Sequence, residues 1–121
     1  MAVAAEGKLR SASEFRRVFR EGRAVSTPHL VIHTAKRADT GSGRYGLVVS
    51  KKFGNAVVRN RARRQLRAAV AMAGGIPPGV DSVIVAKPGA QLRVAALAQE
   101  IWQIMDEHGA DKWPGGSNDG R

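Results

Sequence analysis

An arginine-rich segment between residues 59 and 67 contains the side chains most able to do chemistry in this sequence. It holds five arginines and one asparagine: Arg59, Asn60, Arg61, Arg63, Arg64 and Arg67. A guanidinium group binds a phosphate through two parallel N–H donors and can also stack on a nucleobase. These residue types therefore indicate binding of a polyanion rather than covalent chemistry by the protein itself.

A helix over residues 56–73 is the element that must position these arginines. Asn55 is a suitable N-cap, and Gly74-Gly75 ends the periodic segment. At about 100° per residue, the arginines spread over roughly half of the helix circumference. The opposite arc is apolar and consists of Val58, Ala62, Leu66, Ala69, Val70 and Ala73. We expect the apolar arc to face a core and the arginines to face a ligand.

The arginines repel one another unless a ligand neutralises them. Arg59 and Arg63 stand four residues apart, as do Arg63 and Arg67, and each such pair costs about 0.2–0.5 kcal/mol. No acidic residue lies between positions 40 and 80 to relieve this repulsion. The plainer interpretation, a solvated helix face, is disfavoured by the missing acids and by the adjoining Lys51-Lys52.

The overall charge supports a nucleic acid as the ligand, with an anionic membrane as the second candidate. The 121 residues carry a formal net charge of +10. Residues 1–67 hold 16 basic and 4 acidic residues, a balance of +12, whereas residues 68–121 hold 4 and 6, a balance of −2. A concentrated basic surface attracts and steers a polyanion.

Several other classes of protein are disfavoured by what the sequence lacks. It has no cysteine, which excludes disulfides, thiol catalysis and cysteine-based zinc sites and fits a reducing compartment. Its first residues contain no apolar h-region, and no apolar run approaches the ~18 residues of a membrane span. We therefore expect a cytoplasmic protein.

The remaining pattern predicts one α+β domain over residues 8–108, with flexible termini at 1–7 and 109–121. A capping box at Ser11 or Ser13 with Glu14 starts a short helix that ends at Gly22. Strands are expected at 29–35 and 44–50, paired as a hairpin, and at 81–86 as a buried central strand. A last helix covers about 90–107. Helices packed on a small sheet form a sandwich.

The segment around the arginines resembles the protein subunit of bacterial ribonuclease P. The resemblance rests on Lys51-Lys52-Phe53-Gly54-Asn55-Ala56-Val57-Val58-Arg59-Asn60-Arg61-Ala62-Arg63-Arg64-Gln65-Leu66-Arg67, in which Arg59-Asn60-Arg61 corresponds to the family's Arg-Asn-Arg box. Weaker similarities flank it at Leu9-Arg10, Phe15-Arg16-Arg17-Val18-Phe19 and Ala86-Lys87-Pro88-Gly89-Ala90. Together they cover about residues 8–107.

This resemblance implies a fold and a function that the residue pattern alone does not give. The implied fold is an α-β-β-β-α-β-α sandwich with a left-handed β-α-β crossover. The implied function is that of a small subunit which helps a catalytic RNA remove the 5′ leader from precursor tRNA. The family likeness places Mg²⁺ at the active site of the RNA, and it gives the protein no cofactor, no small-molecule substrate and no membrane contact.

The resemblance also divides the candidate site residues into two groups. Arg59, Asn60, Arg61, Arg63, Arg64 and Arg67 would bind the RNA subunit. A second group, Phe15, Arg16, Phe19, Lys51, Lys52 and Phe53, would lie near a cleft for the single-stranded leader. A leader of variable sequence needs stacking surfaces and phosphate contacts rather than recognition of base edges. For Phe15 and Phe19, burial in the core remains an equal alternative.

Catalysis by the protein itself is disfavoured. His29 and His33 alternate onto one face of the expected first strand, but no third metal ligand is evident nearby. The ten carboxylates are scattered, and no pair is placed for acid–base catalysis.

Three alternative functions remain: a general or ribosome-associated RNA-binding protein, a protein-only nuclease and a membrane-surface protein.

Overall fold

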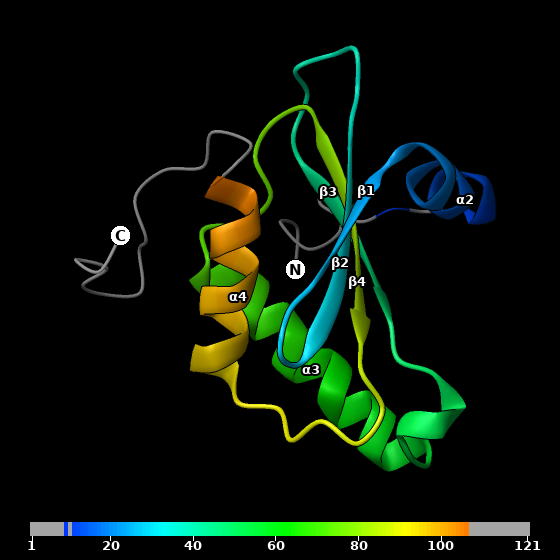
Figure 1. The fold of residues 1–121 in the computed structure, drawn as a ribbon, viewed down its shortest axis with the longest axis vertical. Coiled ribbons are helices and arrows are strands. Elements are labelled where there is room, and N and C mark those ends of the chain that lie inside the picture. The colour runs from blue at the N-terminus through cyan, green and yellow to red at the C-terminus, as the bar shows by residue number, and fades with distance from the viewer. Residues whose placement is uncertain (1–8, 10, 107–121) are drawn as a thin grey trace.

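The computed structural model describes Leu9 and residues 11–106, which form a four-stranded mixed sheet with helices on both faces (Figure 1). The elements in chain order are α2 (Ala12–Glu21), β1 (Arg23–Ser26), β2 (Leu30–Lys36), β3 (Arg44–Val48), the 3₁₀ turn η1 (Lys51–Phe53), α3 (Ala56–Met72), β4 (Val80–Ala86) and α4 (Val94–Asp106). This order confirms the expected α-β-β-β-α-β-α sandwich. The segments 1–7 and 109–121, expected to be flexible, lie outside the described residues.

The sheet has the strand order β1-β2-β4-β3. β2 pairs antiparallel with both β1 and β4, whereas β3 pairs parallel with β4. The expected hairpin between residues 29–35 and 44–50 is therefore wrong, because β4 lies between those two strands. β4 is buried along its whole length except for the half-buried Val85, so it needs neighbours at both edges and cover on both faces.

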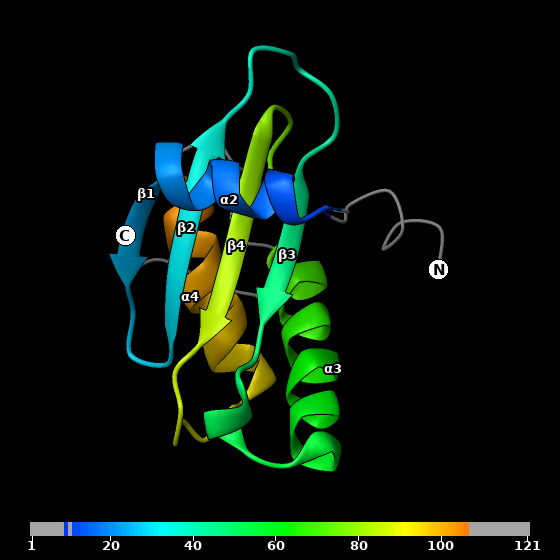
Figure 2. The same ribbon diagram turned by 90° about the vertical axis from the view of Figure 1, so that its right-hand side faces the viewer.

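Figure 2 shows how the three helices cover the sheet. α2 crosses one face, and α3 and α4 lie on the other. Figure 2 also shows that the connection from β3 through α3 to β4 is left-handed, as the family resemblance implies. About 98% of such crossovers are right-handed. The left-handed path places α3 along the β3 edge of the sheet, where one side of the helix stays open to solvent.

The helix ends follow the capping residues expected from the sequence. Ser11 caps α2, because its hydroxyl accepts a hydrogen bond from Glu14 N at 3.2 Å and Glu14 Oε1 accepts one from Ser11 N at 3.1 Å. The side chain of Asn55 accepts a hydrogen bond from Val58 N at 3.0 Å at the start of α3. α4 begins at Val94, later than the expected residue 90, since no side-chain cap defines an earlier start.

The residue pattern did not predict the short strand β1, because its four residues show no alternation of buried and exposed positions. It enters the sheet directly after Gly22, which ends α2. A Cβ atom at Gly22 would lie 2.5 Å from the carbonyl oxygen of Thr34 in β2. Glycine is thus required here for the close approach of the helix end to β2, and it permits the chain to turn at once into β1.

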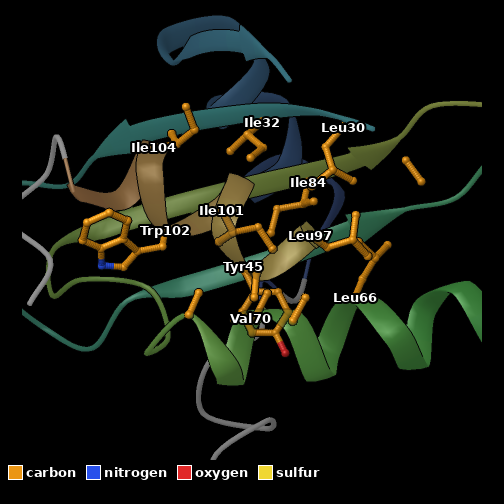
Figure 3. Packing of buried hydrophobic residues seen from close by; sticks show 14 of the residues in the cluster. Leu30, Ile32, Tyr45, Leu66, Val70, Ile84, Leu97, Ile101, Trp102 and Ile104 are labelled. Atoms are coloured by element: carbon orange, nitrogen blue, oxygen red, sulfur yellow. The ribbon is translucent and has the colours of Figure 1, made fainter. Parts of the chain in front are cut away.

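Two hydrophobic clusters lie on opposite faces of the sheet. The larger one joins the sheet to α3 and α4 (Figure 3), and the smaller one, formed by Leu9, Val18, Ala35 and Val83, lies under α2. α3 contributes the expected apolar arc to the larger cluster, with one exception. Val58 is 41% exposed, because it covers Gly54 in the preceding turn instead of reaching the core.

Candidate nucleic-acid interface

The arginines of α3 occupy its solvent side, as expected. Arg61 and Arg64 are exposed. Arg59, Arg63 and Arg67 are half-buried beside the apolar arc of the helix. Asn60 is also exposed, and its Oδ1 accepts a hydrogen bond from Arg63 Nη1 at 3.1 Å. Burial of the opposite arc fixes the orientation of the helix and so turns the whole arginine group outward.

None of these five arginines forms an ion pair with an acidic side chain in the described part of the chain. The Nε atom of Arg59 is buried without a hydrogen-bond partner. These cations therefore keep most of their donors available. A phosphate backbone supplies acceptors of matching charge and spacing.

A second group of arginines, under and beside α2, has the opposite arrangement. Asp81 of β4 is 0% exposed and accepts hydrogen bonds from three of them. The distances to its carboxylate oxygens are 2.7 Å from Arg17 Nη2, 2.5 Å from Arg37 Nη1, and 2.8 and 2.7 Å from Arg44 Nε and Nη2. We refer to these four residues as the Asp81 cluster.

The electrostatics of the Asp81 cluster favour the ionised form of every member. Burial by itself raises the pKa of Asp81, but the hydrogen bonds from Arg44, Arg17 and Arg37 outweigh burial and hold this pKa at about 2. The hydrogen bond to Asp81 is also the main reason why the pKa of Arg44 is raised. Each arginine pairs with one further acid, namely Glu21, Asp39 or Glu14. These arginines belong to the internal structure of the protein.

The two phenylalanines of α2 have different surroundings, which the sequence left open. Phe15 is half-buried against the smaller cluster, and its ring lies directly over Gly46 of β3, where a Cβ atom would come within 2.2 Å of Phe15 Cζ. Phe19 is 45% exposed and contacts the His33 ring edge-to-face, with 4.6 Å between the ring centroids. Phe19 therefore offers an aromatic surface to solvent, whereas Phe15 is mainly a packing residue.

The structure does not gather the whole expected leader group in one place. Arg16, Lys51 and Lys52 are exposed, the latter two on the turn η1. Phe53, also on η1, packs against the larger cluster on the α3 and α4 side of the sheet. It is therefore separated by the sheet from the phenylalanines of α2, which lie on the other face.

A hollow of about 140 Å³ at the β3 edge connects the two predicted groups of residues. It is lined by Leu9, Phe15, Tyr45, Gly46, Leu47, Arg63 and Arg67. Phe15 comes from the expected leader group and the two arginines from the expected RNA-subunit group. The division of the site residues into two separate surfaces is thus incomplete, because these residues share one hollow.

Sequence reasoning missed two acids that organise the structure. The signal for Asp81 was an acid at the start of an apolar strand, and the signal for Glu100 was an acid within the apolar face of α4. Glu100 is 8% exposed and its Oε1 accepts a hydrogen bond from Thr27 Oγ1 at 2.5 Å. Its Oε2 lies 2.6 Å from His29 Nδ1. Both acids hold neighbouring elements together rather than a ligand.

The expectation that His29 and His33 share one face is wrong. His29 precedes β2 and turns toward Glu100 of α4, whereas His33 contacts Phe19 on the α2 side. Burial lowers the pKa of His33. Within residues 9 and 11–106, no group of three or more histidines, cysteines or acids is arranged to hold a metal ion. In the same residues, no helix is long and apolar enough to cross a membrane.

Comparison with known proteins identifies the family. A profile of the ribonuclease P family matches residues 3–109. The chain belongs to this family. It is 40% identical to the ribonuclease P protein component of Brevibacillus brevis over 100 residues, which cover 81% of this chain and 79% of that protein. It is also 40% identical to the same component of Gluconacetobacter diazotrophicus over 105 residues, which cover 84% and 90%.

Solved structures of the family have the same fold. The ribonuclease P protein of Thermotoga maritima is 25% identical, with a TM-score of 0.70 over 83% of this chain and 96% of that one. A Staphylococcus aureus ribonuclease P protein mutant is 21% identical, with a TM-score of 0.74 over 89% and 92%. These comparisons confirm the family resemblance that was drawn from the Arg59-Asn60-Arg61 motif, and they confirm the fold.

Proposed function

We propose that this ribonuclease P component is the RNA-binding protein subunit of a bacterial ribonucleoprotein that removes the 5′ leader from precursor tRNA. The observation that carries the proposal is the row of arginines on α3, which no acidic side chain among the described residues neutralises. Five cations of this kind on one helix are unfavourable in the free protein. They become favourable when phosphates bind, because each contact releases counterions and forms charge-assisted hydrogen bonds.

In this proposal, the catalytic RNA subunit binds α3 through Arg59, Asn60, Arg61, Arg63, Arg64 and Arg67. The geometry of α3 supports this role, since the buried apolar arc holds the helix firmly while the arginines stay accessible. Arginine contacts to phosphate position an RNA without requiring a particular sequence. A highly structured RNA partner suits such a surface.

The leader of precursor tRNA is proposed to pass over the α2 face. Phe19 offers exposed ring surface there and contacts the half-buried His33, and the exposed Arg16 adds a positive charge on the same helix. Lys51 and Lys52 on η1 would contact phosphates farther along the strand. Stacking on aromatic rings tolerates any base, which fits leaders of different sequence.

The hydrolysis itself is assigned to the RNA subunit, with Mg²⁺ bound there. The protein would contribute positive charge close to phosphates of both RNAs, so that less Mg²⁺ is needed to hold them together. This role uses the arginines as electrostatic and hydrogen-bonding groups and requires no acid–base pair from the chain.

Reconstitution with the cognate RNA subunit tests the proposal. Full-length protein, RNA subunit and precursor tRNA are mixed at low Mg²⁺, with protein alone and RNA alone as controls. We expect cleavage at the mature 5′ end only with the complete mixture, and none with the protein alone. Cleavage by nuclease-free protein alone would support a protein-only nuclease. Binding of many unrelated RNAs without any effect on cleavage would support the alternative of a general RNA-binding protein.

A further inference from the structure

The hollow at the β3 edge has the size of one aromatic ring. Its volume of about 140 Å³ is close to that of the roughly 150 Å³ engineered cavity that binds benzene in another protein. Phe15, Leu9 and Leu47 supply its apolar walls. At Gly46 the Phe15 ring occupies the space of a side chain, since a Cβ atom there would collide with Phe15.

Polar groups with available donors line the same hollow. Tyr45 is 9% exposed, and its hydroxyl keeps contact with solvent and forms no hydrogen bond in the described part of the chain. Figure 3 shows this hydroxyl directed from the sheet toward α3. Arg67 lies near enough for its charge to act on the Tyr45 hydroxyl. Among the described residues, the Arg63 side chain donates a hydrogen bond only to Asn60, and the Arg67 side chain donates none.

The Tyr45 phenol and the two guanidinium groups therefore have donors that a ligand in the hollow can reach. An apolar wall combined with a few converging polar groups is typical of a small-ligand site. A ligand that matches this lining presents a flat ring to the apolar wall, an acceptor to Tyr45 and an anion to the arginines.

We propose that this hollow binds a single extruded nucleotide of an RNA partner. Its base enters against Phe15 and Leu47 and accepts a hydrogen bond from the Tyr45 hydroxyl, and its phosphate binds Arg63 and Arg67. Single-stranded segments can turn a base out of the strand in this way. The inference rests on the proposed function and adds a defined site for one nucleotide to it. The nucleotide comes either from the precursor tRNA leader or from an unpaired position of the RNA subunit.

Tyr45 is the only tyrosine of the chain, which allows a direct test. Protein labelled with 3-fluorotyrosine gives one ¹⁹F resonance, located in the hollow. This protein is titrated with a nucleoside 5′-monophosphate, with a single-stranded trinucleotide and with inorganic phosphate. We expect a saturable shift with the nucleotide and the trinucleotide, and a weaker response to phosphate alone. A resonance that neither nucleotide ligand moves overturns the inference.

Two variants separate binding in the hollow from a general effect of charge. Arg67→Ala should weaken trinucleotide binding by about tenfold or more, the loss typical of a charged hydrogen bond. Arg93→Ala removes the same charge from an exposed position outside the hollow and should leave trinucleotide binding unchanged. Equal weakening by both variants would mean that only the net charge matters, and would contradict the site.

Tyr45→Phe removes the hydroxyl alone and controls for folding. Because this hydroxyl keeps contact with solvent and forms no hydrogen bond in the described part of the chain, the variant should melt at nearly the same temperature as the original chain. Trinucleotide affinity should nevertheless fall by about two- to tenfold. An unchanged affinity would show that the hydroxyl does not contact the nucleotide, contrary to the proposal.

RNAs that lack a single base show which of the two RNAs supplies the nucleotide. Single abasic positions are introduced in the leader of precursor tRNA or in unpaired positions of the RNA subunit. At the position that enters the hollow, the abasic RNA should bind about tenfold less tightly, and Tyr45→Phe should add little further loss. If no abasic position in either RNA weakens binding, but reconstitution still restores cleavage, only the nucleotide site is refuted. Failure of reconstitution would refute the proposed function instead.

Discussion

The two groups of arginines in this protein differ in what neutralises them. Arg17, Arg37 and Arg44 surround the buried carboxylate of Asp81 and hold α2 and the start of β3 against β4. The five arginines of α3 have no acidic partner in the described part of the chain and face outward. The same residue type thus stabilises the fold in one region and remains free for a ligand in the other.

The comparison shows that a count of basic residues overstates the surface available to RNA. Residues 1–67 contain 16 basic residues, and three of these are the arginines of the Asp81 cluster. Their charges are balanced internally by Asp81, Glu14, Glu21 and Asp39. Fewer basic side chains are therefore available to RNA than a count of residues suggests, and α3 carries five of the available ones. The experiments below test this difference, from the largest expected effect to the smallest.

Replacing Asp81 by Asn should have the largest effect. Removal of one partner from a buried ion pair typically costs 3–5 kcal/mol, and we expect about 3 kcal/mol because the arginines retain some contact with water. Urea denaturation measures this loss. Asp39→Asn, at an exposed position, serves as the control and should change stability little. Equal stability of the Asp81→Asn variant and the original chain would show that the cluster contributes nothing to the fold.

The Asp81 cluster should also make stability depend on pH in the acid range. The pKa of Asp81 is about 2 in the folded protein and 3.8 ordinarily, so the unfolded chain binds the proton first. The stabilisation is fully present above about pH 4 and is lost as the pH falls toward 2, by an amount on the order of 2 kcal/mol. The free energies of unfolding of the original chain and of Asp81→Asn should approach each other as the pH falls through this range. A constant difference between them would contradict the low pKa of Asp81.

The phenylalanines of α2 extend the comparison to apolar residues. Phe15→Ala should lower stability by several kcal/mol, at or below the usual ~3–5 kcal/mol, because Phe15 is only half-buried. Phe19→Ala should leave the melting temperature nearly unchanged but weaken leader binding by about 1–3 kcal/mol if its ring stacks on a base. Affinities for precursor tRNA and for mature tRNA without a leader separate the two effects. An equal loss for both RNAs with Phe19→Ala would remove it from the leader site.

Single substitutions on α3 should have the smallest effect on the fold. Arg59→Ala, Arg61→Ala and Arg63→Ala should each change stability by less than about 0.5 kcal/mol, since these side chains pair with no acid that the structure describes. Each should reduce the salt dependence of RNA-subunit binding by about 0.7–0.9 in the logarithmic slope. Binding measured at several salt concentrations gives this slope. A slope that all three variants leave unchanged would show that α3 makes no phosphate contacts.

Local features of the fold could be predicted from the sequence because they depend on neighbouring residues. Ser11 with Glu14 set the start of α2, and Asn55 set that of α3. The apolar run 81–86 marked the central strand. Residues 29–35 and 44–50 were also recognised as strands, but their pairing was predicted wrongly. Pairing depends on β4, which comes later in the chain and enters the sheet between them.

Some features of the candidate site likewise follow from the sequence, whereas others depend on the tertiary structure. By itself, the sequence determined that α3 is amphipathic and that its arginines have no acidic neighbour on the helix, because a period of 3.6 residues fixes which side chains share a face. Only the tertiary structure decided which arginines elsewhere are neutralised, since Asp81 reaches its partners across 37 to 64 residues of chain. It also decided that Phe15 and Tyr45 share a hollow with Arg63 and Arg67, because a hollow forms only where separate elements pack together.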